Sequence, residues 1–214
     1  ERNVMKNKVS IIGAGMTGMA ASLFAGNRNI ETVQIGITGE IIFASGLLDL
    51  LGVHPIEDGV IRKDPWEGIE HLCRDLPEHP YARIPPTLIH DAFEELIDFL
   101  NTSGLVYVRK KRQNALVLTP AGTVKPSYFI PQTMWNGVKA LETKAPCLIV
   151  DIEGLKGFSA RQIVASFESL WPGLAYTTIS FPGSALPGEV YLEPLARSLV
   201  IAQARKALAD ELRP

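Results

Sequence analysis

The sequence predicts an α/β protein in which a parallel βαβ unit comes first, an α+β region follows, and a second βαβ unit lies towards the end. Residues 9–12, rich in β-branched side chains, lead directly into a glycine-rich turn and a stretch of strong helix formers. Residues 145–152 form a near-continuous apolar run, typical of a strand buried on both faces of a parallel sheet. Short apolar runs alternate with polar turns over residues 105–125, which indicates β-hairpins.

The glycine-rich turn has the spacing of a nucleotide-binding turn. Residues 13–18 read Gly-Ala-Gly-Met-Thr-Gly, and residues 19–25 continue as a helix. In such a turn the first glycine takes a backbone shape closed to other residues, the second admits a phosphate, and the third lets the helix approach the strand. The free amides and positive dipole end of the helix favour an anion. Because residues 31–37 supply a second strand, we expect a Rossmann-like unit of the FAD- or NAD(P)-binding type.

The acidic residue that usually ends the second strand is missing. An Asp or Glu about twenty residues after the first glycine ordinarily holds the ribose of an adenosine, but residues 34–37 read Gln-Ile-Gly-Ile. Glu31 comes too early, and Glu40 comes several residues late. Either a turn at Gly39 returns Glu40 to the ribose, or the ligand has no adenosine, a case that flavin mononucleotide (FMN) fits.

Residues 36–52 are apolar and interrupted by small residues. In flavoproteins with this unit, the chain after the second strand commonly passes the isoalloxazine ring, where small residues permit backbone contact. Ser45 and Gly46 are the candidates for that contact. The alternative is a buried loop followed by a short helix from Leu47.

Two helices are predicted next. The first begins at Asp64 with a capping box and a proline at its first position. Its apolar face includes Cys73, which is therefore expected in the core rather than as a reactive thiol. The second begins at Thr87 and ends near Gly104, and it is expected to turn these residues inward: Ile89, Phe93, Leu96, Ile97 and Leu100.

Four consecutive cations, residues 109–112, lie between the strands expected at 105–108 and 115–119; a third strand is expected at 123–125. They can bind phosphate or an acidic partner. A charged run in a hairpin is more often a solvated tip that discourages edge pairing, and that is our expectation here.

The second βαβ unit is expected over residues 145–181. Ser159 and Gln162 form the capping box of its helix, and Ile163, Phe167 and Leu170 are expected to face inward. The turn at residues 154–158 can bind an anion, but it lacks the full glycine pattern, so a structural role is expected. A last helix is expected near Pro194, with these residues on one face: Leu195, Leu199 and Ala202.

Composition excludes several classes of protein. The chain has 214 residues and a net charge of −2, which argues against a general nucleic-acid binder and against disorder. Its two cysteines, Cys73 and Cys147, lie far apart, so neither a disulfide framework nor a metal site is expected, and a cytoplasmic setting is the default. No apolar run approaches the roughly 20 residues that span a bilayer. The four histidines are scattered, so no catalytic residue is assigned.

Several pieces, taken in order, resemble the B subunit family of anaerobic glycerol-3-phosphate dehydrogenase, a flavoprotein. The most distinctive reads Ser-Gly-Leu-Leu-Asp-Leu-Leu over residues 45–51. The others are the glycine turn with its strand, a His-Pro-Tyr piece, a Thr-Pro-Ala-Gly-Thr piece and a Gly-Leu-Lys-Gly-Phe piece, at residues 11–18, 79–81, 119–123 and 154–158. Together they cover nearly the whole chain.

The resemblance implies a subunit of a complex that oxidises sn-glycerol 3-phosphate to dihydroxyacetone phosphate and passes electrons towards menaquinone. It implies two partners, a larger flavin subunit and an iron–sulfur subunit that attaches the cytoplasmic complex to the inner face of the membrane. It implies FMN as cofactor, with FAD as the alternative. The phosphate would be held by Gly13, Ala14, Gly15, Met16, Thr17 and Gly18, and the ring would lie by Ser45 and Gly46.

The resemblance also implies a domain division. Residues 5–53 correspond to the flavin-binding segment, and residues 54–214 to an inserted α+β cap or substrate region. The family's longer chain returns late to the first domain, and nothing in this sequence supplies that return. We therefore expect the isolated chain to bind flavin weakly or not at all, and to expose an apolar sheet edge that favours self-association.

Two other functions stay open. An FAD- or NAD(P)-dependent oxidoreductase of another family is favoured if Glu40 reaches a ribose. A non-catalytic docking subunit that keeps a vestigial nucleotide fold is favoured if no cofactor is bound.

Overall fold

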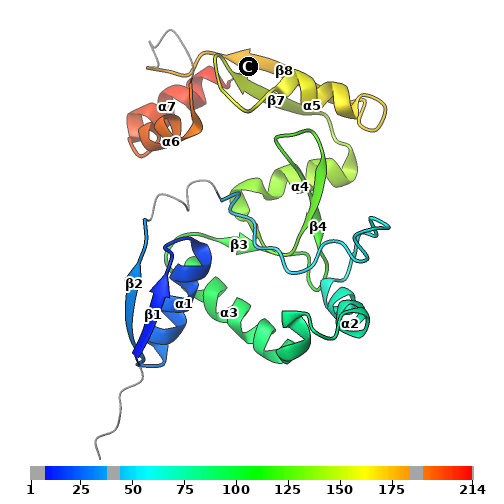
Figure 1. The fold of residues 1–214 in the computed structure, drawn as a ribbon. Coiled ribbons are helices and arrows are strands. Elements are labelled where there is room, and N and C mark those ends of the chain that lie inside the picture. The colour runs from blue at the N-terminus through cyan, green and yellow to red at the C-terminus, as the bar shows by residue number, and fades with distance from the viewer. Residues whose placement is uncertain (1–7, 38–43, 184–189, 214) are drawn as a thin grey trace, which may run out of the picture. The chain divides into compact units, whose positions relative to one another are not determined.

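A computed structural model describes residues 8–37, 44–183 and 190–213 (Figure 1). The chain forms two compact units. Unit 1 comprises residues 1–115 and 126–134, and unit 2 comprises residues 116–125 and 135–214.

Unit 1 begins with the predicted βαβ unit. Strand β1 (Lys8–Ile12) is followed by helix α1 (Met16–Asn27) and strand β2 (Glu31–Ile35). The two strands are parallel, with Lys8 opposite Glu31 and Ile12 opposite Ile35. Figure 1 shows α1 lying against this strand pair. The strand, turn, helix and strand expected from the glycine pattern are confirmed.

The face of β1 and β2 that points away from α1 is apolar and exposed. Ile12 is 90% exposed, Val33 57%, Ile35 65% and Ile37 78%. Side chains alternate along a strand, so Val33, Ile35 and Ile37 share a face, and Ile12 joins them as the partner of Ile35. The expected apolar surface is therefore a whole sheet face and not only an edge; self-association through it stays a prediction.

Two helices and a short 3₁₀ turn follow. They are α2 (Pro65–Asp75), η2 (Pro80–Arg83) and α3 (Pro86–Thr102). Asp64 caps α2 as predicted, accepting hydrogen bonds from the amides of Trp66 (2.8 Å) and Glu67 (3.2 Å). Cys73 is half-buried against the core of unit 1, which confirms its structural placement.

The core of unit 1 joins residues far apart in the sequence. Its buried members are Leu48, Leu50, Trp66, Ile69, Ile97, Tyr128 and Phe129. The helix expected from Leu47 is wrong, because Leu48 instead exchanges two backbone hydrogen bonds with Phe129, both of 3.0 Å. Residues 44–51 thus run as irregular chain through this core.

The β-rich section differs from the expected series of hairpins. β3 (Tyr107–Val108) pairs antiparallel with β6 (Ile130–Pro131), so the expectation that it pairs with the next strand is wrong. β4 (Ala115–Leu118) and β5 (Val124–Ser127) do form the expected pair, joined by a turn in which Gly122 has φ +74°.

Unit 2 contains the second βαβ unit. After η3 (Gln132–Met134), which ends unit 1, come α4 (Trp135–Thr143), β7 (Cys147–Ile152), α5 (Ala160–Phe167) and β8 (Leu174–Ile179), followed by α6 (Leu192–Ser198) and α7 (Ala202–Glu211). β7 and β8 are parallel, as predicted. The core of this unit consists of Leu141, Ile163, Phe167, Trp171 and Leu174.

Three expectations in unit 2 are wrong. Leu170 is 64% exposed, because α5 ends at Phe167 and the following turn buries Trp171 instead. β7 is not buried on both faces, since Leu148 is 54% exposed. The expected single last helix is two helices, separated near Leu199, and the helix break leaves Ala202 exposed.

Within the described residues, no helix combines the length and hydrophobicity that a membrane span requires. The same residues contain no group of three histidine, cysteine, aspartate or glutamate side chains placed to hold a metal ion.

Candidate nucleotide-binding site

The turn between β1 and α1 depends on the conformation of Gly13. Gly13 has φ +114°, a backbone region that side chains rarely adopt, and its N–H donates to the carbonyl of Ile35 over 2.7 Å. The bond ties the end of β1 to the end of β2. Gly13 therefore has the role that the sequence assigned to the first glycine.

Gly18 permits close packing of α1 against this turn. A Cβ atom at Gly18 would lie 2.2 Å from the carbonyl oxygen of Gly13, far closer than atoms approach without a bond. The contact is with backbone, which cannot rotate away. A glycine is therefore required here.

Gly15 opens the start of α1 to a ligand. It is the N-cap residue, no side chain caps the helix, and the first turn carries no acidic residue. The first amides of the helix, on Met16, Thr17 and Gly18, have no intrahelical acceptors. A Cβ at Gly15 would meet no atom within 4 Å, so the space beside it is open. The start of α1 therefore offers main-chain N–H donors, the positive end of the helix dipole and open space, which together favour the binding of a phosphate.

The other residues of the turn differ in what they offer. Ala14 is buried, with 4% of its surface exposed, and the half-buried side chain of Met16 packs against the core of unit 1. Thr17 is exposed. The backbone of the turn, together with the Thr17 hydroxyl, is what a ligand can reach.

Gln34 supports the turn in a way that sequence reasoning missed. Its Nε2 donates to the carbonyl of Gly13 (2.9 Å), and its Oε1 accepts from the Ser22 hydroxyl (2.9 Å). The side chain thus links β2, the turn and α1. The available signal was a polar residue between the two apolar residues Val33 and Ile35, on the face that α1 covers.

Gly36 is one of the four residues, 34–37, that stand where the usual ribose-binding acid would be expected. A Cβ there would lie 2.5 Å from the amide nitrogen of Ala14 and 2.8 Å from the carbonyl carbon of Gly13. The backbone leaves no room for a carboxylate side chain at this position. Glu40, the other candidate, lies outside the described residues.

Ser45 and Gly46 are held by unit 1 through different contacts. The hydroxyl of Tyr107 donates to the carbonyl of Gly46 over 2.7 Å, and the amide of Leu47 donates to Ser45 Oγ over 3.3 Å. Burial raises the pKa of the Tyr107 hydroxyl, which keeps it a donor. No hydrogen bond between the described residues joins this pair to the glycine turn. Met16 of the turn packs against the core cluster that contains Leu48 and Leu50.

The turn of the second βαβ unit is occupied by its own side chains. The amide of Ala160 donates to Asp151 Oδ2 (3.0 Å), and that of Gln162 donates to Ser159 Oγ (3.3 Å). A carboxylate already stands where an external anion would bind. The expected structural role of this turn agrees with these contacts.

The cationic run forms a tight turn that a bridge between Lys110 and Gln113 closes, with Lys111 and Arg112 exposed at its tip as expected. Arg109 Nη1 is 2.5 Å from Glu94 Oε1, and its guanidinium lies 5.0 Å from the ring centre of Phe129. Arg112 Nε is 3.0 Å from Asp64 Oδ2. The expectation is wrong for Arg109, which packs inward with its side chain 30% exposed, whereas the Arg112 side chain is 65% exposed despite its ion pair with Asp64.

Comparison with known proteins agrees with this geometry. Residues 8–170, well over half of the chain, match the family described as "FAD binding domain". The chain belongs to this family. A Rossmann-like α/β fold and a flavin ligand are the properties of such a domain, and the open glycine turn fits them.

This FAD-binding domain is also similar to named proteins. A protein of Yersinia pestis bv. Antiqua (strain Antiqua), named as the B subunit of anaerobic glycerol-3-phosphate dehydrogenase, is 29% identical over 97% of this chain and 50% of its own length. A protein of Halobacterium salinarum (strain ATCC 29341 / DSM 671 / R1), named as the probable B subunit of the same enzyme, is 30% identical over 86% of this chain and 42% of its own. The resemblance expected from the sequence is confirmed. The chain spans about half the length of these relatives. No solved structure gives a match.

Proposed function

We propose that this chain is the flavin-binding part of an anaerobic glycerol-3-phosphate dehydrogenase subunit. In this proposal the complex oxidises sn-glycerol 3-phosphate to dihydroxyacetone phosphate and passes the electrons towards menaquinone. The family match and the similarity to B subunits support it. The observation that carries it is the uncapped start of α1 beside Gly15, which offers main-chain donors and open space to a phosphate.

In this proposal the flavin supplies the redox chemistry, while the protein positions it and excludes competing reactions. The phosphate lies against the turn of Gly13, Ala14, Gly15, Met16, Thr17 and Gly18, where the amides donate to it. Ser45 and Gly46 lie by the ring. Residues 5–53 form the flavin-binding segment, and residues 54–214 form the cap or substrate region.

The identity of the flavin is a separate point. The family match favours FAD and gives no support to the expected FMN. The absence of room for a side chain at Gly36 means that an adenosine ribose would need another acceptor, and Glu40 is the candidate. We propose FAD first, with FMN as the alternative.

The partners follow from the same similarity. We infer a larger flavin subunit and an iron–sulfur subunit, with the assembly on the cytoplasmic side of the inner membrane through those partners. The support is that the relatives carry the name of a subunit.

The test is a Gly15→Ala variant of the purified protein. The Gly15 φ of −74° is ordinary for alanine, and the new methyl group would contact nothing in the protein. It would, however, occupy the space that the phosphate needs. We expect flavin occupancy to fall at least about tenfold, a loss of about 1.4 kcal/mol of binding, while the melting temperature changes little. Flavin absorbance measures occupancy, and mass spectrometry of the released cofactor separates FAD from FMN.

The matched control is Gly26→Ala in the same helix, where the added methyl group also meets no atom within 4 Å. It should leave flavin occupancy unchanged. Where the wild type binds added flavin, equal occupancy in Gly15→Ala would overturn the assigned phosphate site; a wild type that binds no added flavin would confirm the expectation for the isolated chain, and the same pair of proteins is then compared within the purified complex.

The exposed apolar face of β1 and β2 favours one other function, a docking subunit. Ile12 and Ile37 are 90% and 78% exposed, as expected of a surface that another chain covers. A purified complex in which this subunit carries no flavin would favour a docking subunit over a subunit that takes part in electron transfer.

A further inference from the structure

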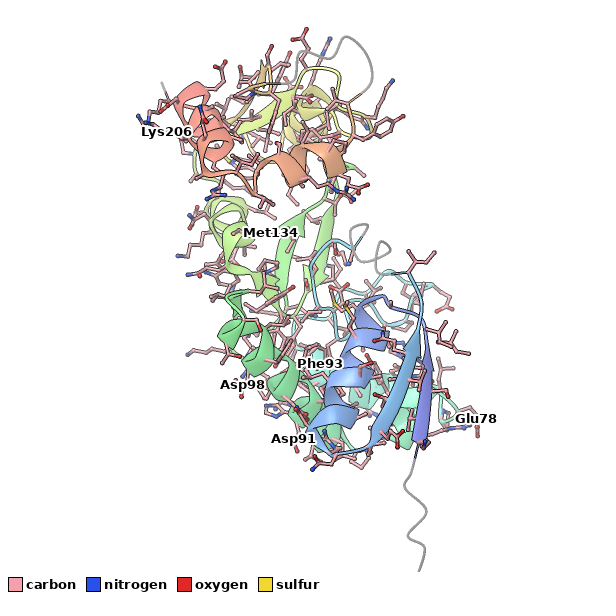
Figure 2. The ribbon with its side chains drawn as sticks, turned by 90° about the vertical axis from the view of Figure 1, so that its left-hand side faces the viewer. Glu78, Asp91, Phe93, Asp98, Met134 and Lys206 are labelled. Carbon is pink, nitrogen blue, oxygen red and sulfur yellow. The ribbon has the colours of Figure 1, made fainter. Side chains whose placement is uncertain are left out.

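Unit 1 contains a cavity of about 490 Å³ that is separate from the glycine turn, since none of residues 13–18 lines it. Its lining residues come mainly from α2, from the first turns of α3 and from residues 109–112. Asp91, which is one of them, is labelled on α3 in Figure 2. The volume is within the range of small-molecule sites.

Aromatic side chains form the apolar part of the cavity wall. Trp66 and Tyr128 are 7% and 2% exposed, and their rings meet edge to face with centres 5.9 Å apart. The ring of His90, which also lines the cavity, has its centre 6.0 Å from that of Trp66. Aromatic rings of this kind bury the apolar part of a ligand and attract a cation to their faces.

The hydroxyl group of Tyr128 has an unused proton. Its oxygen accepts a hydrogen bond from Trp66 Nε1 over 3.0 Å, and that contact leaves the O–H of Tyr128 itself without an acceptor. No other described residue takes this proton. A buried donor without an acceptor costs free energy, and an oxygen atom of a ligand in the cavity would remove that cost.

Three cations lie in the turn that completes the wall. Arg109 Nη1 is 2.5 Å from Glu94 Oε1. Arg112 Nε donates to Asp64 Oδ2 over 3.0 Å. Each guanidinium has five N–H donors, so these contacts leave others for a ligand, and their planar arrangement matches the two oxygens of a carboxylate. Lys111 is exposed and forms no ion pair with a described residue.

Two further carboxylates decide the charge of the ligand. Glu70 of α2 and Asp91 of α3 line the cavity, and neither forms an ion pair with a lysine or an arginine among the described residues. The two arginines are neutralised by their own partners, so these two carboxylates are opposed by Lys111 alone. A dianion such as phosphate is therefore repelled, whereas a ligand that also carries a positive charge is attracted.

We propose that the cavity binds a free amino acid with an apolar side chain, at a site separate from the flavin turn. Its carboxylate accepts hydrogen bonds from Lys111, from the Tyr128 hydroxyl and from the free N–H groups of the two arginines. Its ammonium group is held by Glu70 and Asp91, and its side chain packs on Trp66. The proposal goes beyond the proposed function and does not depend on flavin binding.

The test is a calorimetric titration of the purified protein with L-phenylalanine at constant ionic strength. Two analogues each lack one charged group: phenylpropionate has no ammonium group, and phenylethylamine has no carboxylate. We expect saturable binding of L-phenylalanine and affinities at least about tenfold lower for both analogues, as the loss of one charge-assisted contact predicts. Inorganic phosphate should show no saturable binding.

Two variants assign each charged group of the ligand to its partner. Asp91→Asn should weaken L-phenylalanine about tenfold and should not weaken phenylpropionate, which has no ammonium group to lose a contact. Lys111→Asn should weaken L-phenylalanine by a similar factor and should not weaken phenylethylamine. Asparagine is suitable at position 111 because the φ of Lys111 is +50°, a backbone region that asparagine tolerates.

The matched control is Asp98→Asn, which removes another exposed carboxylate of α3 that does not line the cavity. Figure 2 shows both Asp91 and Asp98 on this helix. The control should leave the affinity for L-phenylalanine unchanged. The proposal is overturned by any of three results: no saturable binding of L-phenylalanine, equal affinity for the two analogues and L-phenylalanine, or equal weakening by Asp98→Asn and Asp91→Asn.

Discussion

The two βαβ units have the same topology but differ at the start of the helix. In the first, α1 begins at Gly15 with no side-chain cap. In the second, Ser159 caps α5 and Asp151 accepts from the amide of Ala160. The place of an external anion is open in one unit and filled by a protein carboxylate in the other. Topology alone therefore does not distinguish the two units; the residues at the start of each helix do.

The glycines of the two turns also act differently. Gly154 and Gly157 have φ of +79° and +76°, so they serve the path of the chain. A Cβ at Gly157 would meet no atom within 4 Å, whereas one at Gly18 would collide with the Gly13 carbonyl. In the first unit Gly18 brings the backbone of the helix close to that of the turn, which is what holds the helix start over the turn.

The largest effect is expected from Gly18→Ala. The methyl group cannot fit 2.2 Å from a backbone oxygen, so α1 must move away from β1. We expect a loss of about 1–3 kcal/mol in the free energy of unfolding, the usual cost of overpacking, and loss of flavin. Denaturant unfolding and flavin absorbance measure the two. Gly157→Ala in the second turn should leave flavin unchanged, and a Gly18→Ala protein with wild-type stability would contradict the packing role.

A smaller effect is expected from Asp151→Ala in the second unit. It removes the acceptor for the Ala160 amide at the start of α5. We expect unit 2 to lose about 1 kcal/mol of stability, as for other helix caps, with no change in flavin occupancy. Hydrogen exchange of the α5 amides measures the change locally. Loss of flavin in this variant would show that the second turn is not merely structural.

Local patterns in the sequence were sufficient for both βαβ units. The glycine spacing predicted the turn at Gly13, and the capping boxes at Asp64 and Ser159 predicted two helix starts that the structure confirms. These signals depend on residues within a few positions of each other, so they are readable without knowledge of the fold.

Pairings between distant residues were not predictable in this way. Leu48 bonds to Phe129 and β3 pairs with β6, yet no local pattern connects those segments. In the sequence, Gln34 is one of the residues at the position of the usual ribose-binding acid. In the structure its side chain hydrogen-bonds to Gly13 and Ser22 and so stabilises the turn. Arg109 belongs to a charged run but stacks on aromatic rings, because partners from other elements surround it.

The smallest expected effect is a change in the stability of α1 with pH, and it follows from the different contacts that attach α1 and α5 to the rest of their units. The end of α1 is joined to α3 by Arg28, which donates to both oxygens of Glu95 over 3.0 Å, whereas α5 is attached by buried Ile163 and Phe167. The hydrogen bonds from Arg28 and Asn27 lower the pKa of the Glu95 carboxyl. A carboxyl whose pKa is lower in the folded state contributes stability above its ordinary pKa, and that contribution is lost as the pH falls through the folded pKa.

We therefore expect acid to increase hydrogen exchange in the last turn of α1 before it does so in α5. The effect should be slight, since the pair is exposed and screened by salt. Glu95→Gln should flatten this acid dependence in α1 and leave α5 unchanged; Asp98→Asn, an exposed carboxylate on the same helix α3, is the control. If hydrogen exchange in α1 and in α5 increases at the same pH, the attachment of α1 does not depend on the ion pair between Arg28 and Glu95. The difference between the two units would then be limited to the residues at the start of each helix.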